Sequence, residues 1–284
     1  MNSIALPSPR PIQGGQLHAL MLKLRHHAGI RIESPRQIIE EHIEARMSLL
    51  GMTDINEYLA LFDQSISARA EWLALVDLLT VKETRFFRQP DALECAAEYV
   101  HELVTAGPTP REIAFWSAGC ATGQELYSMA MVVEQIIAEH QPLLQWHGIG
   151  TDISFSAIHQ AQSGRFEESA VVSVPDGYRE SYMQRADDGS WDISSDIKAR
   201  THFFHSNLMH VNSTPFADFN IIFCQNVLIY FERQKQRWII DQLVNRLKAG
   251  GLLILGAGED VQWLNSSMRR LSWPGVCAYT KTGG

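Results

Sequence analysis

Hydrophobic and polar positions follow a helical period in the first third of the chain. Residues 17, 20, 21 and 24 are apolar and would share one face of a helix. Ser34, Pro35 and Gly51 bracket a second such run, since Ser caps helices, Pro suits the first helical position and Gly commonly ends a helix. Two shorter amphipathic runs follow, and no strand is expected before position 110. We therefore predict an all-helical N-terminal unit.

From about residue 112 onward, short apolar runs alternate with helical patterns. Such alternation is typical of a mostly parallel sheet with helices on both faces, which binds ligands beyond the carboxyl ends of its strands. The polar stretch 165–205 interrupts the alternation and predicts an inserted small β-rich subdomain. The predicted strands lie within 112–119, 143–153, 216–231 and 251–258, with edge-strand material from 271 onward. The predicted helices are 123–140, 154–163 and 232–251, the last closed by Gly250 and Gly251.

These patterns predict a three-part organisation. Residues 1–15, with their proline and glycine content, are expected to form a flexible tail, and residues 16–90 a helical domain with a linker. Residues 91–284 would form an α/β domain that carries the subdomain. A chain of 284 residues with 45% hydrophobic and 20% charged residues can bury an ordinary globular core.

Charge and cysteine content narrow the possible functions. The formal net charge of −8 argues against broad nucleic-acid binding. None of the four cysteines stands at Cys-x-x-Cys spacing, so we expect buried thiols in a reduced cytoplasm and no metal site. The longest strongly apolar stretch, 221–231, is too short to span a bilayer, and the N-terminus lacks a signal-peptide core, so no membrane insertion is expected.

Three predicted strand ends carry candidate ligand-binding residues. Gly119 and Gly123 lie in the turn after the first strand, where a ligand can approach the backbone and the next helix offers free N–H groups. Asp152 ends the second strand, where a carboxylate can accept hydrogen bonds from ribose hydroxyls. Asn226 interrupts the third run, and a buried amide needs partners. Together they indicate an adenosine-containing ligand, and the missing Gly-x-Gly-x-x-Gly argues against a dinucleotide.

Each of these positions also has a purely structural interpretation. The glycine turn can be a tight turn that binds nothing, Asp152 can cap the following helix, and Asn226 can be satisfied by backbone groups. The histidines are scattered, and no Ser-His-Asp or Cys-His arrangement is evident.

Six segments, in their order and spacing, resemble the chemotaxis receptor protein-glutamate O-methyltransferase family, CheR. They are VKETRFFRQPDAL, FWSAGCATGQELYSMAM, GTDIS, FFHSNL, FNIIFCQNVLIYFERQ and AGGLLILGAGE. The resemblance covers the chain from about 16 to 275. It implies an α/β fold: a class I S-adenosylmethionine methyltransferase (Rossmann-like) sheet with an inserted small β-subdomain, preceded by a small all-helical N-terminal domain. The methyltransferase domain would be residues 91–284.

The resemblance also implies a binding site for S-adenosylmethionine and its product S-adenosylhomocysteine. Asp152 matches the ribose-binding acid of the family, and Asn207 with Leu208 matches the pair beside the adenine. The Thr-x-Phe-Phe-Arg segment would reach the site from the linker. The expected cofactor-binding residues are Lys82, Thr84, Arg88, Gly119, Glu125, Asp152, Asn207, Leu208, Gln225, Asn226 and Val227.

This chain departs from the family pattern at three positions. Lys82, Gln124 and Gln225 stand where family members commonly have Asn, Glu and Arg. An Arg replaced by Gln loses a fixed charge and a forked donor, for which the added cation of Lys82 can compensate in part. The matching Asp, Glu, Asn, Thr and Arg remain, so an active enzyme is expected.

The implied reaction is methyl transfer to glutamate side chains of chemoreceptors. A carboxylate is already ionised at pH 7, so positioning and exclusion of water are expected to matter more than a general base. Arg88 and Tyr230 are the candidate catalytic residues, because a guanidinium and a phenolic hydroxyl can orient the incoming carboxylate. Tyr230 can equally be a core aromatic residue.

The implied partner is the helical cytoplasmic domain of a chemoreceptor, docked on the N-terminal helices. Residues 1–90 carry ten Lys/Arg and ten Asp/Glu, so a basic docking stripe would have to be local. Its candidate members are Lys23, Arg25, Arg31, Arg36 and Arg46, which can equally be ordinary solvated charges.

Other aspects of recognition follow from the same resemblance. The segment 182–207 is a few residues shorter than in members that bind a receptor tether peptide, so recognition without a tether is expected. A monomeric cytoplasmic enzyme is expected. The alternatives are a non-catalytic S-adenosylmethionine-binding regulatory module and a methyltransferase for another acceptor.

Overall fold

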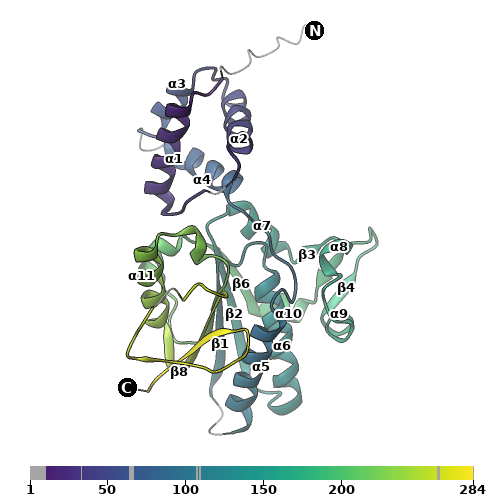
Figure 1. Ribbon diagram of the computed structural model, residues 1–284. Coiled ribbons are helices and arrows are strands. Elements are labelled where there is room, and N and C mark those ends of the chain that lie inside the picture. The colour runs from purple at the N-terminus through teal and green to yellow at the C-terminus, as the bar shows by residue number, and fades with distance from the viewer. Residues whose placement is uncertain are drawn as a thin grey trace. The chain divides into compact units, whose positions relative to one another are not determined.

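The chain divides into two compact units, shown in Figure 1. The computed structural model describes residues 11–32, 34–63, 67–106, 108, 110–260 and 263–283. The first unit comprises Met1–Val81 and Tyr230–Glu232, and the second comprises Lys82–Ile229 and Arg233–Gly284. Residues 82–90, assigned to the linker above, therefore group with the second unit. Of the expected tail, residues 1–10 lie outside the described part, and Gly14 already begins a helix.

The first unit is helical, as the periodicity predicted. Its apolar stripes meet in a core that contains the fully buried side chains of Leu20, Ile43, Met47 and Leu75. Gly29, with φ of 80°, ends the first helix in the left-handed conformation that glycine adopts without strain. The helices are α1 (Gly14–Ala28), α2 (Arg36–Leu49), α3 (Ile55–Leu61) and α4 (Ser67–Leu79).

Basic side chains proposed for a docking stripe are largely paired within this unit. Arg46 donates to the buried carboxylate of Glu71 through Nε (3.0 Å) and Nη2 (2.6 Å), and the Tyr58 hydroxyl donates to the same carboxylate. Arg46 is thus a structural residue of the helical core, contrary to the expectation of a solvent-facing role. The further ion pairs are Lys23–Asp63, Arg25–Glu232 and Arg36–Glu40.

A seven-stranded sheet is the framework of the second unit, within the described ranges. Its strand order is β6-β2-β1-β7-β8-β10-β9, parallel as far as β8 and antiparallel for the last two strands. The order reverses beside β1, between β2 and β7, which creates the crevice where open α/β sheets bind ligands. The strands are β1 (Glu112–Ala118), β2 (Gln145–Asp152), β6 (Thr201–His205), β7 (Phe219–Cys224), β8 (Leu247–Leu255), β9 (Met268–Arg270) and β10 (Cys277–Lys281).

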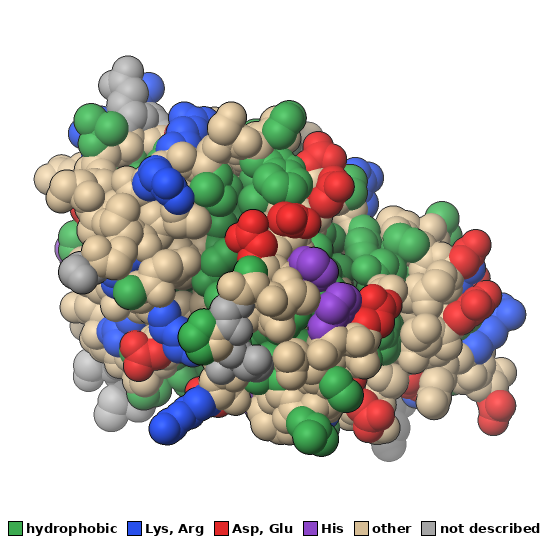
Figure 2. All heavy atoms as spheres, turned by 90° about the horizontal axis from the view of Figure 1, so that it is seen from below, with side chains coloured by type: hydrophobic (Ala, Val, Ile, Leu, Met, Phe, Trp, Pro, Cys, Tyr) green, Lys and Arg blue, Asp and Glu red, His purple; other side chains and the backbone are tan. Residues whose placement is uncertain are grey.

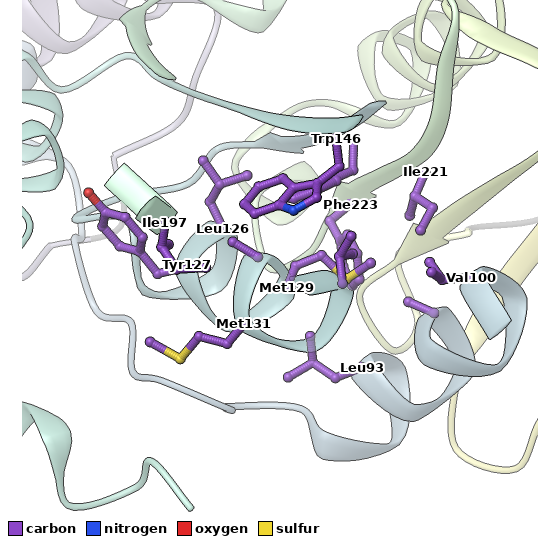
Figure 3. Packing of buried hydrophobic residues seen from close by; sticks show 14 of the residues in the cluster. Leu93, Val100, Leu126, Tyr127, Met129, Met131, Trp146, Ile197, Ile221 and Phe223 are labelled. Atoms are coloured by element: carbon purple, nitrogen blue, oxygen red, sulfur yellow. The ribbon is translucent and has the colours of Figure 1, made fainter. Parts of the chain in front are cut away.

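Helices cover both faces of this sheet. α5, α6 and α10 lie on one side and α11 on the other (Figure 1). Ile113 and Phe115 of β1 point into the core under α5 and α6, whereas Trp116 faces the opposite side and packs against Phe219. Figure 3 shows, from close by, buried residues of the core between the sheet and helices α5 and α6. The helices are α5 (Pro90–Thr105), α6 (Gln124–His140), α7 (Phe155–Ser163), α10 (Ser195–Arg200) and α11 (Arg233–Val244).

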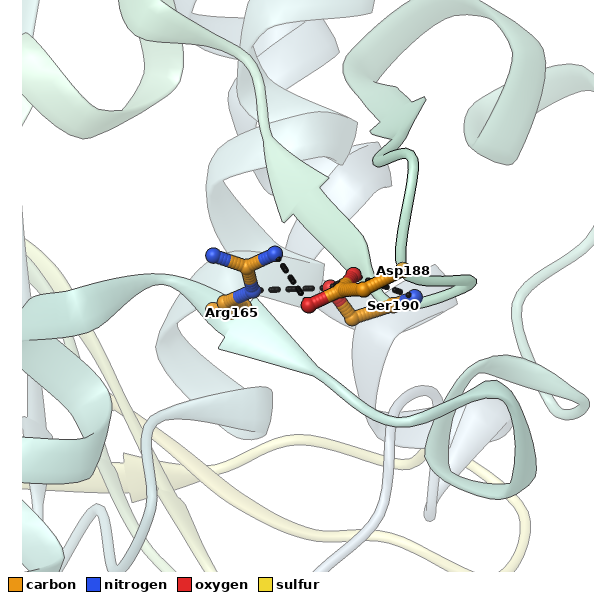
Figure 4. A network of polar contacts seen from close by, with 3 residues as sticks. All are labelled: Arg165, Asp188 and Ser190. Atoms are coloured by element: carbon orange, nitrogen blue, oxygen red, sulfur yellow. Dashed lines mark hydrogen bonds and ion pairs between the residues drawn. The ribbon is translucent and has the colours of Figure 1, made fainter.

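The predicted insertion contains a separate three-stranded sheet. β3 (Arg165–Phe166), β5 (Trp191–Ile193) and β4 (Met183–Arg185) pair in that order, with α8 (Glu168–Val171) and α9 (Asp176–Tyr182) between them in sequence. Arg165 ties β3 to the turn before β5 by donating to Ser190 and Asp188, at 2.7 Å each (Figure 4). The last part of the insertion, Thr201–His205, is β6 of the main sheet.

Two elements differ from the sequence-based expectation. Helix α11 ends at Val244, and β8 begins at Leu247, so Gly250 and Gly251 do not close the helix. Leu247 pairs with Phe219, and the next paired residue is Leu252, so the intervening residues bulge from the strand with φ of 76° at Gly250. Helix α5 was not predicted, although Pro90 stands at its first position.

Charged and hydrophobic side chains share the face of the molecule that Figure 2 draws. On the face drawn in Figure 2, acidic and basic side chains are interspersed with hydrophobic ones. Across the described residues, none of the helices has the length and apolar character needed to cross a membrane. Those residues also contain no cluster of three or more His, Cys, Asp or Glu suited to a metal ion.

Candidate functional site

The turn after β1 lies against β2 and the segment after β7. The N–H of Gly119 donates to the carbonyl of Thr151 at 2.7 Å. Gly119, Ala121 and Gly123 all have positive φ, at 88°, 46° and 94°. A Cβ atom on Gly119 would lie 2.3 Å from Cγ2 of Val227, so this position excludes any side chain. The glycine predicted for close approach therefore brings two candidate binding segments together.

Asp152 joins this turn to the tip of β2. One carboxylate oxygen accepts the N–H of Ala121 (2.9 Å) and the other accepts the N–H of Ser154 (2.8 Å). Ser154, rather than Asp152, caps α7 by accepting the N–H of Ala157. Burial raises the pKa of Asp152, and the two N–H donors oppose that shift. Because an ionised carboxylate has about four acceptor sites, Asp152 retains capacity for ligand hydroxyls.

Glu125 lies in the first turn of α6, beside the glycine turn. Its Oε1 accepts a hydrogen bond from the Ser117 hydroxyl at 2.7 Å. Burial raises the pKa of Glu125 to about 7, the Ser117 bond opposes this shift, the charge of Glu259 adds to it and the charge of Arg88 opposes it. The carboxylate thus sits where a cationic ligand group would relieve its desolvation.

The segment after β7 contains three predicted cofactor-binding residues. Gln225 is buried, and its amide donates to Oε1 of Gln89 at 2.8 Å, just before α5. Asn226 has φ of 58°, a left-handed conformation that Asn tolerates better than most residues. Within the described part of the chain, the Asn226 side chain forms no hydrogen bond. The backbone-satisfied interpretation of this amide therefore does not hold, and the amide is available to a ligand.

The segment 82–88 is anchored to the second unit by its two phenylalanines. Phe86 is fully buried edge-to-face against Phe166, and the N–H of Phe87 donates to the Ser128 hydroxyl at 3.0 Å. The polar candidates of this segment are half-buried. Lys82 donates to the Ser156 hydroxyl (2.8 Å), Thr84 lies between them, and Arg88 donates to the carbonyl of Glu83 (2.9 Å).

Asn207 and Leu208 begin the short 3-10 helix η1 (Leu208–Ser213) just beyond β6. The Asn207 side chain caps this turn by accepting the N–H of Met209 at 2.9 Å, and Leu208 is buried. Tyr230 ends the 3-10 helix η2 (Leu228–Tyr230) but groups with the first unit, where its carbonyl accepts the N–H of Arg31 at 2.7 Å.

Glu259 is a site residue that the sequence reasoning missed. It is 3% exposed, lies just after β8, and its carboxylate accepts backbone N–H groups of Asn226 (2.9 Å), Gly256 (2.8 Å) and Ile229 (3.2 Å). The available signal was an acid four residues beyond the apolar run Leu252–Leu255, in the sequence Gly-Ala-Gly-Glu.

These residues fit a nucleoside that carries positive charge. Asp152 ends β2, Glu259 follows β8 and Glu125 lies in the first turn of α6, and burial raises the pKa of each carboxyl. An ammonium or sulfonium group would offset that cost, while ribose hydroxyls suit Asp152. Gly119 packs against Val227 and so holds the glycine turn and the segment after β7 together.

Three features together define a class I S-adenosylmethionine-dependent methyltransferase. They are the order of the strands, the glycine turn after β1 and the acidic residue that ends β2. Residues 82–275 match the family described as "CheR methyltransferase, SAM binding domain". The chain belongs to this CheR methyltransferase family. The match spans the second unit almost entirely and confirms the predicted family, fold class and cofactor.

Several curated relatives are named chemotaxis protein methyltransferase. A chemotaxis protein methyltransferase of Vibrio anguillarum is 33% identical over 72% of this chain and 74% of its own length. That of Escherichia coli K12 is 28% identical over 89% of this chain and 85% of its own, and that of Borreliella burgdorferi is 25% identical over 87% and 88%. The similarity to the last two extends into the helical unit, since it covers more than the matched domain.

Proposed function

We propose that this chain transfers the methyl group of S-adenosylmethionine to glutamate side chains in the cytoplasmic helical domain of chemoreceptors. The products would be glutamate methyl esters and S-adenosylhomocysteine. The observation that carries the proposal is the convergence of Gly119, Glu125, Asp152 and Asn226 at the switch point of a CheR-family sheet.

Roles for the chain's own residues follow from their chemistry. Asp152 would accept the ribose hydroxyls, Asn207 and Leu208 would flank the adenine, and Glu125 would pair with the ligand ammonium. When bound, S-adenosylmethionine supplies a methyl group on a sulfonium, which is electrophilic without further activation. The cationic Lys82 lies on the Asp152 side of the site, bonded to Ser156 of α7.

The acceptor requires orientation more than deprotonation. A glutamate carboxylate is ionised at neutral pH, so it can attack without a general base. Arg88 could hold that carboxylate with its forked donors, because the bond to the Glu83 carbonyl occupies only one of its five N–H groups. We propose Tyr230 as a second orienting group, through its hydroxyl. Both assignments predict a loss in kcat larger than the loss in cofactor affinity.

Recognition of the receptor is proposed to use the first unit and no tether peptide. The surface of the helical unit would contact the receptor helices, with Arg46 excluded because it pairs with buried Glu71. A monomeric cytoplasmic enzyme is the proposed state. Equal methylation rates for receptors with and without their C-terminal tether would support this mode, and a tether-dependent rate would contradict it. Light scattering tests the monomer.

The central test is a methyl-transfer assay. Purified protein is mixed with methyl-labelled S-adenosylmethionine and receptor cytoplasmic domains from the same cell, and base-labile label on the receptor is counted. The expected result is label with the native chain and a strong loss with Asp152→Ala. Asp187→Ala is the matched control, since Asp187 is exposed in the small-sheet hairpin.

Calorimetry separates the possible failures of this assay. If S-adenosylhomocysteine binds but no receptor is labelled, the chain is a cofactor-binding regulatory module or uses another acceptor. If label enters the receptor but survives mild base, the product is not a glutamate ester. Either outcome overturns the proposed function while leaving the family membership intact.

A further inference from the structure

Glu259 organises the loop that presents Asn226 and Val227. It follows β8, whereas the loop it contacts follows β7, and the pairing of those two strands brings them together. Three backbone N–H groups converge on its carboxylate: those of Asn226, Gly256 and Ile229. Oε2 takes the first two and Oε1 the third, so both oxygens are used.

The loop needs such an anchor because its backbone is strained. Asn226 has φ of 58°, in the left-handed region that is unfavourable for most residues with a side chain. Its N–H points at Oε2 of Glu259, so the same bond that satisfies the buried donor also fixes the left-handed conformation. Without an acceptor there, both the desolvated N–H and the backbone strain would favour rearrangement of the loop.

The carboxylate of Glu259 occupies space that Gly256 leaves free by lacking a side chain. A Cβ atom on Gly256 would lie 2.2 Å from Oε2 of Glu259, so a side chain at position 256 would displace the carboxylate. The loop continues into Val227, whose methyl groups fill the space above Gly119. Displacement of the loop would therefore reach the glycine turn on the other side of the switch point.

We propose that Glu259 is a positioning residue for cofactor binding, which acts by holding the loop 225–229 in its ligand-ready conformation. This role does not require contact with the cofactor, because it acts through the three bonds to backbone N–H groups. Its negative charge also adds to the electrostatic cost of ionising Glu125, which a bound cation relieves. The inference rests on the proposed function only where turnover is measured, because KM and kcat require the receptor as the methyl acceptor. The Kd for S-adenosylhomocysteine is measured without an acceptor.

Glu259→Gln tests the proposal with little change in shape. An amide can accept through one oxygen only, and its NH₂ would face a backbone N–H. The expected result is a Kd for S-adenosylhomocysteine and a KM for S-adenosylmethionine raised about tenfold, with a smaller change in kcat. Hydrogen exchange should quicken at the amides of Asn226 and Ile229. Asp260→Asn is the matched control, since Asp260 pairs with Arg270 and Tyr279 instead.

A purely structural role makes a different prediction. It would lower Tm in Glu259→Gln while the folded protein kept its native Kd and KM, and that outcome would overturn the proposal. If Glu259→Gln does not fold, Glu259→Asp is measured instead, because the shorter carboxylate cannot reach all three N–H groups and should give an intermediate Kd. Should receptor methylation fail even in the native chain, the Kd comparison still decides the role of Glu259.

Discussion

The N–H of Ala121 donates to the carboxylate of Asp152 across 2.9 Å, which joins the turn after β1 to the tip of β2. Ala121 has a positive φ of 46°, so this bond helps to hold an unfavourable backbone conformation. A single acid therefore shapes the glycine turn and remains able to accept hydrogen bonds from a ligand. Ligand affinity and local order should accordingly change together at this position.

Replacing Asp152 with Ala should weaken cofactor binding strongly. The change removes the acceptor for two backbone N–H groups and for the proposed ribose contact, so we expect Kd for S-adenosylhomocysteine to rise about a hundredfold. Calorimetry measures this directly. A Kd within threefold of native, as expected for the control Asp187→Ala, would show that Asp152 does not face the ligand.

Gly119→Ala should destabilise the second unit through a steric clash with Val227. The added Cβ would lie 2.3 Å from Cγ2 of Val227, and φ of 88° is itself unfavourable for Ala, so we expect a loss of about 2–4 kcal/mol in the free energy of unfolding. Urea denaturation measures the loss. The double variant Gly119→Ala/Val227→Ala should recover part of it, and strict additivity of the two changes would rule out the clash.

Ionisation of Glu125 should make stability fall as pH rises from about 4.5 to about 7. Burial raises the pKa of this carboxyl to about 7 from an ordinary 4.5, so between those values the folded state holds a proton that the unfolded state has lost. The unfolded state then binds fewer protons, and stability decreases with pH. Unfolding measured across this range should show a shallower slope in Glu125→Gln. An identical slope in both proteins would contradict the assignment.

Cofactor binding should release a proton from Glu125 near pH 6.5. A cationic group placed beside this carboxylate would lower its pKa, so a fraction of the protein would ionise on binding. Calorimetry in buffers of different ionisation enthalpy detects the released proton, and Glu125→Gln should release less. Proton uptake in the native chain would argue that the ligand's carboxylate, rather than its ammonium, lies next to Glu125.

Glu71→Ala should destabilise the helical unit locally. It leaves the Arg46 guanidinium and the buried Tyr58 hydroxyl without their shared acceptor, which we expect to cost about 3 kcal/mol. Hydrogen exchange in α2 and α4 measures the local opening free energy. The double variant Arg46→Met/Glu71→Leu should be considerably more stable than Glu71→Ala. Equal exchange in the native chain and Glu71→Ala would show that the pair contributes little.

Local signals in the sequence predicted the sheet and three of the strand-end residues. Buried parallel strands are continuous apolar runs, and the residues that follow them are polar or small, so Gly119, Asp152 and Asn226 could be placed from the pattern alone. The other ligand candidates came from the family resemblance. The predicted end of the last helix at Gly250 was wrong because glycine is common both after helices and in β-bulges. Only the pairing of Leu247 with Phe219 distinguishes these two roles.

Glu259 could not be assigned because its function depends on a distant segment. Asn226 is separated from it by a helix and the whole of β8, and nothing near Glu259 in the sequence identifies a strained loop as its partner. Similarly, the pairing of Arg46 with Glu71 joins two helices, so a solvent-facing arginine and a buried one could not be distinguished by periodicity. Contacts of long sequence separation were the main source of error.

The helical unit is discontinuous in sequence, and this has a consequence for biosynthesis. Residues 230–232 belong to it, with the Tyr230 carbonyl accepting the Arg31 N–H and Glu232 paired with Arg25. During translation, the four helices therefore leave the ribosome long before residues 230–232, which contribute the last contacts of this unit, have been made. Until residues 82–229 have been translated, the nascent helical unit must persist without these contacts, and a genetic fragment ending at Val81 would remain in that incomplete state.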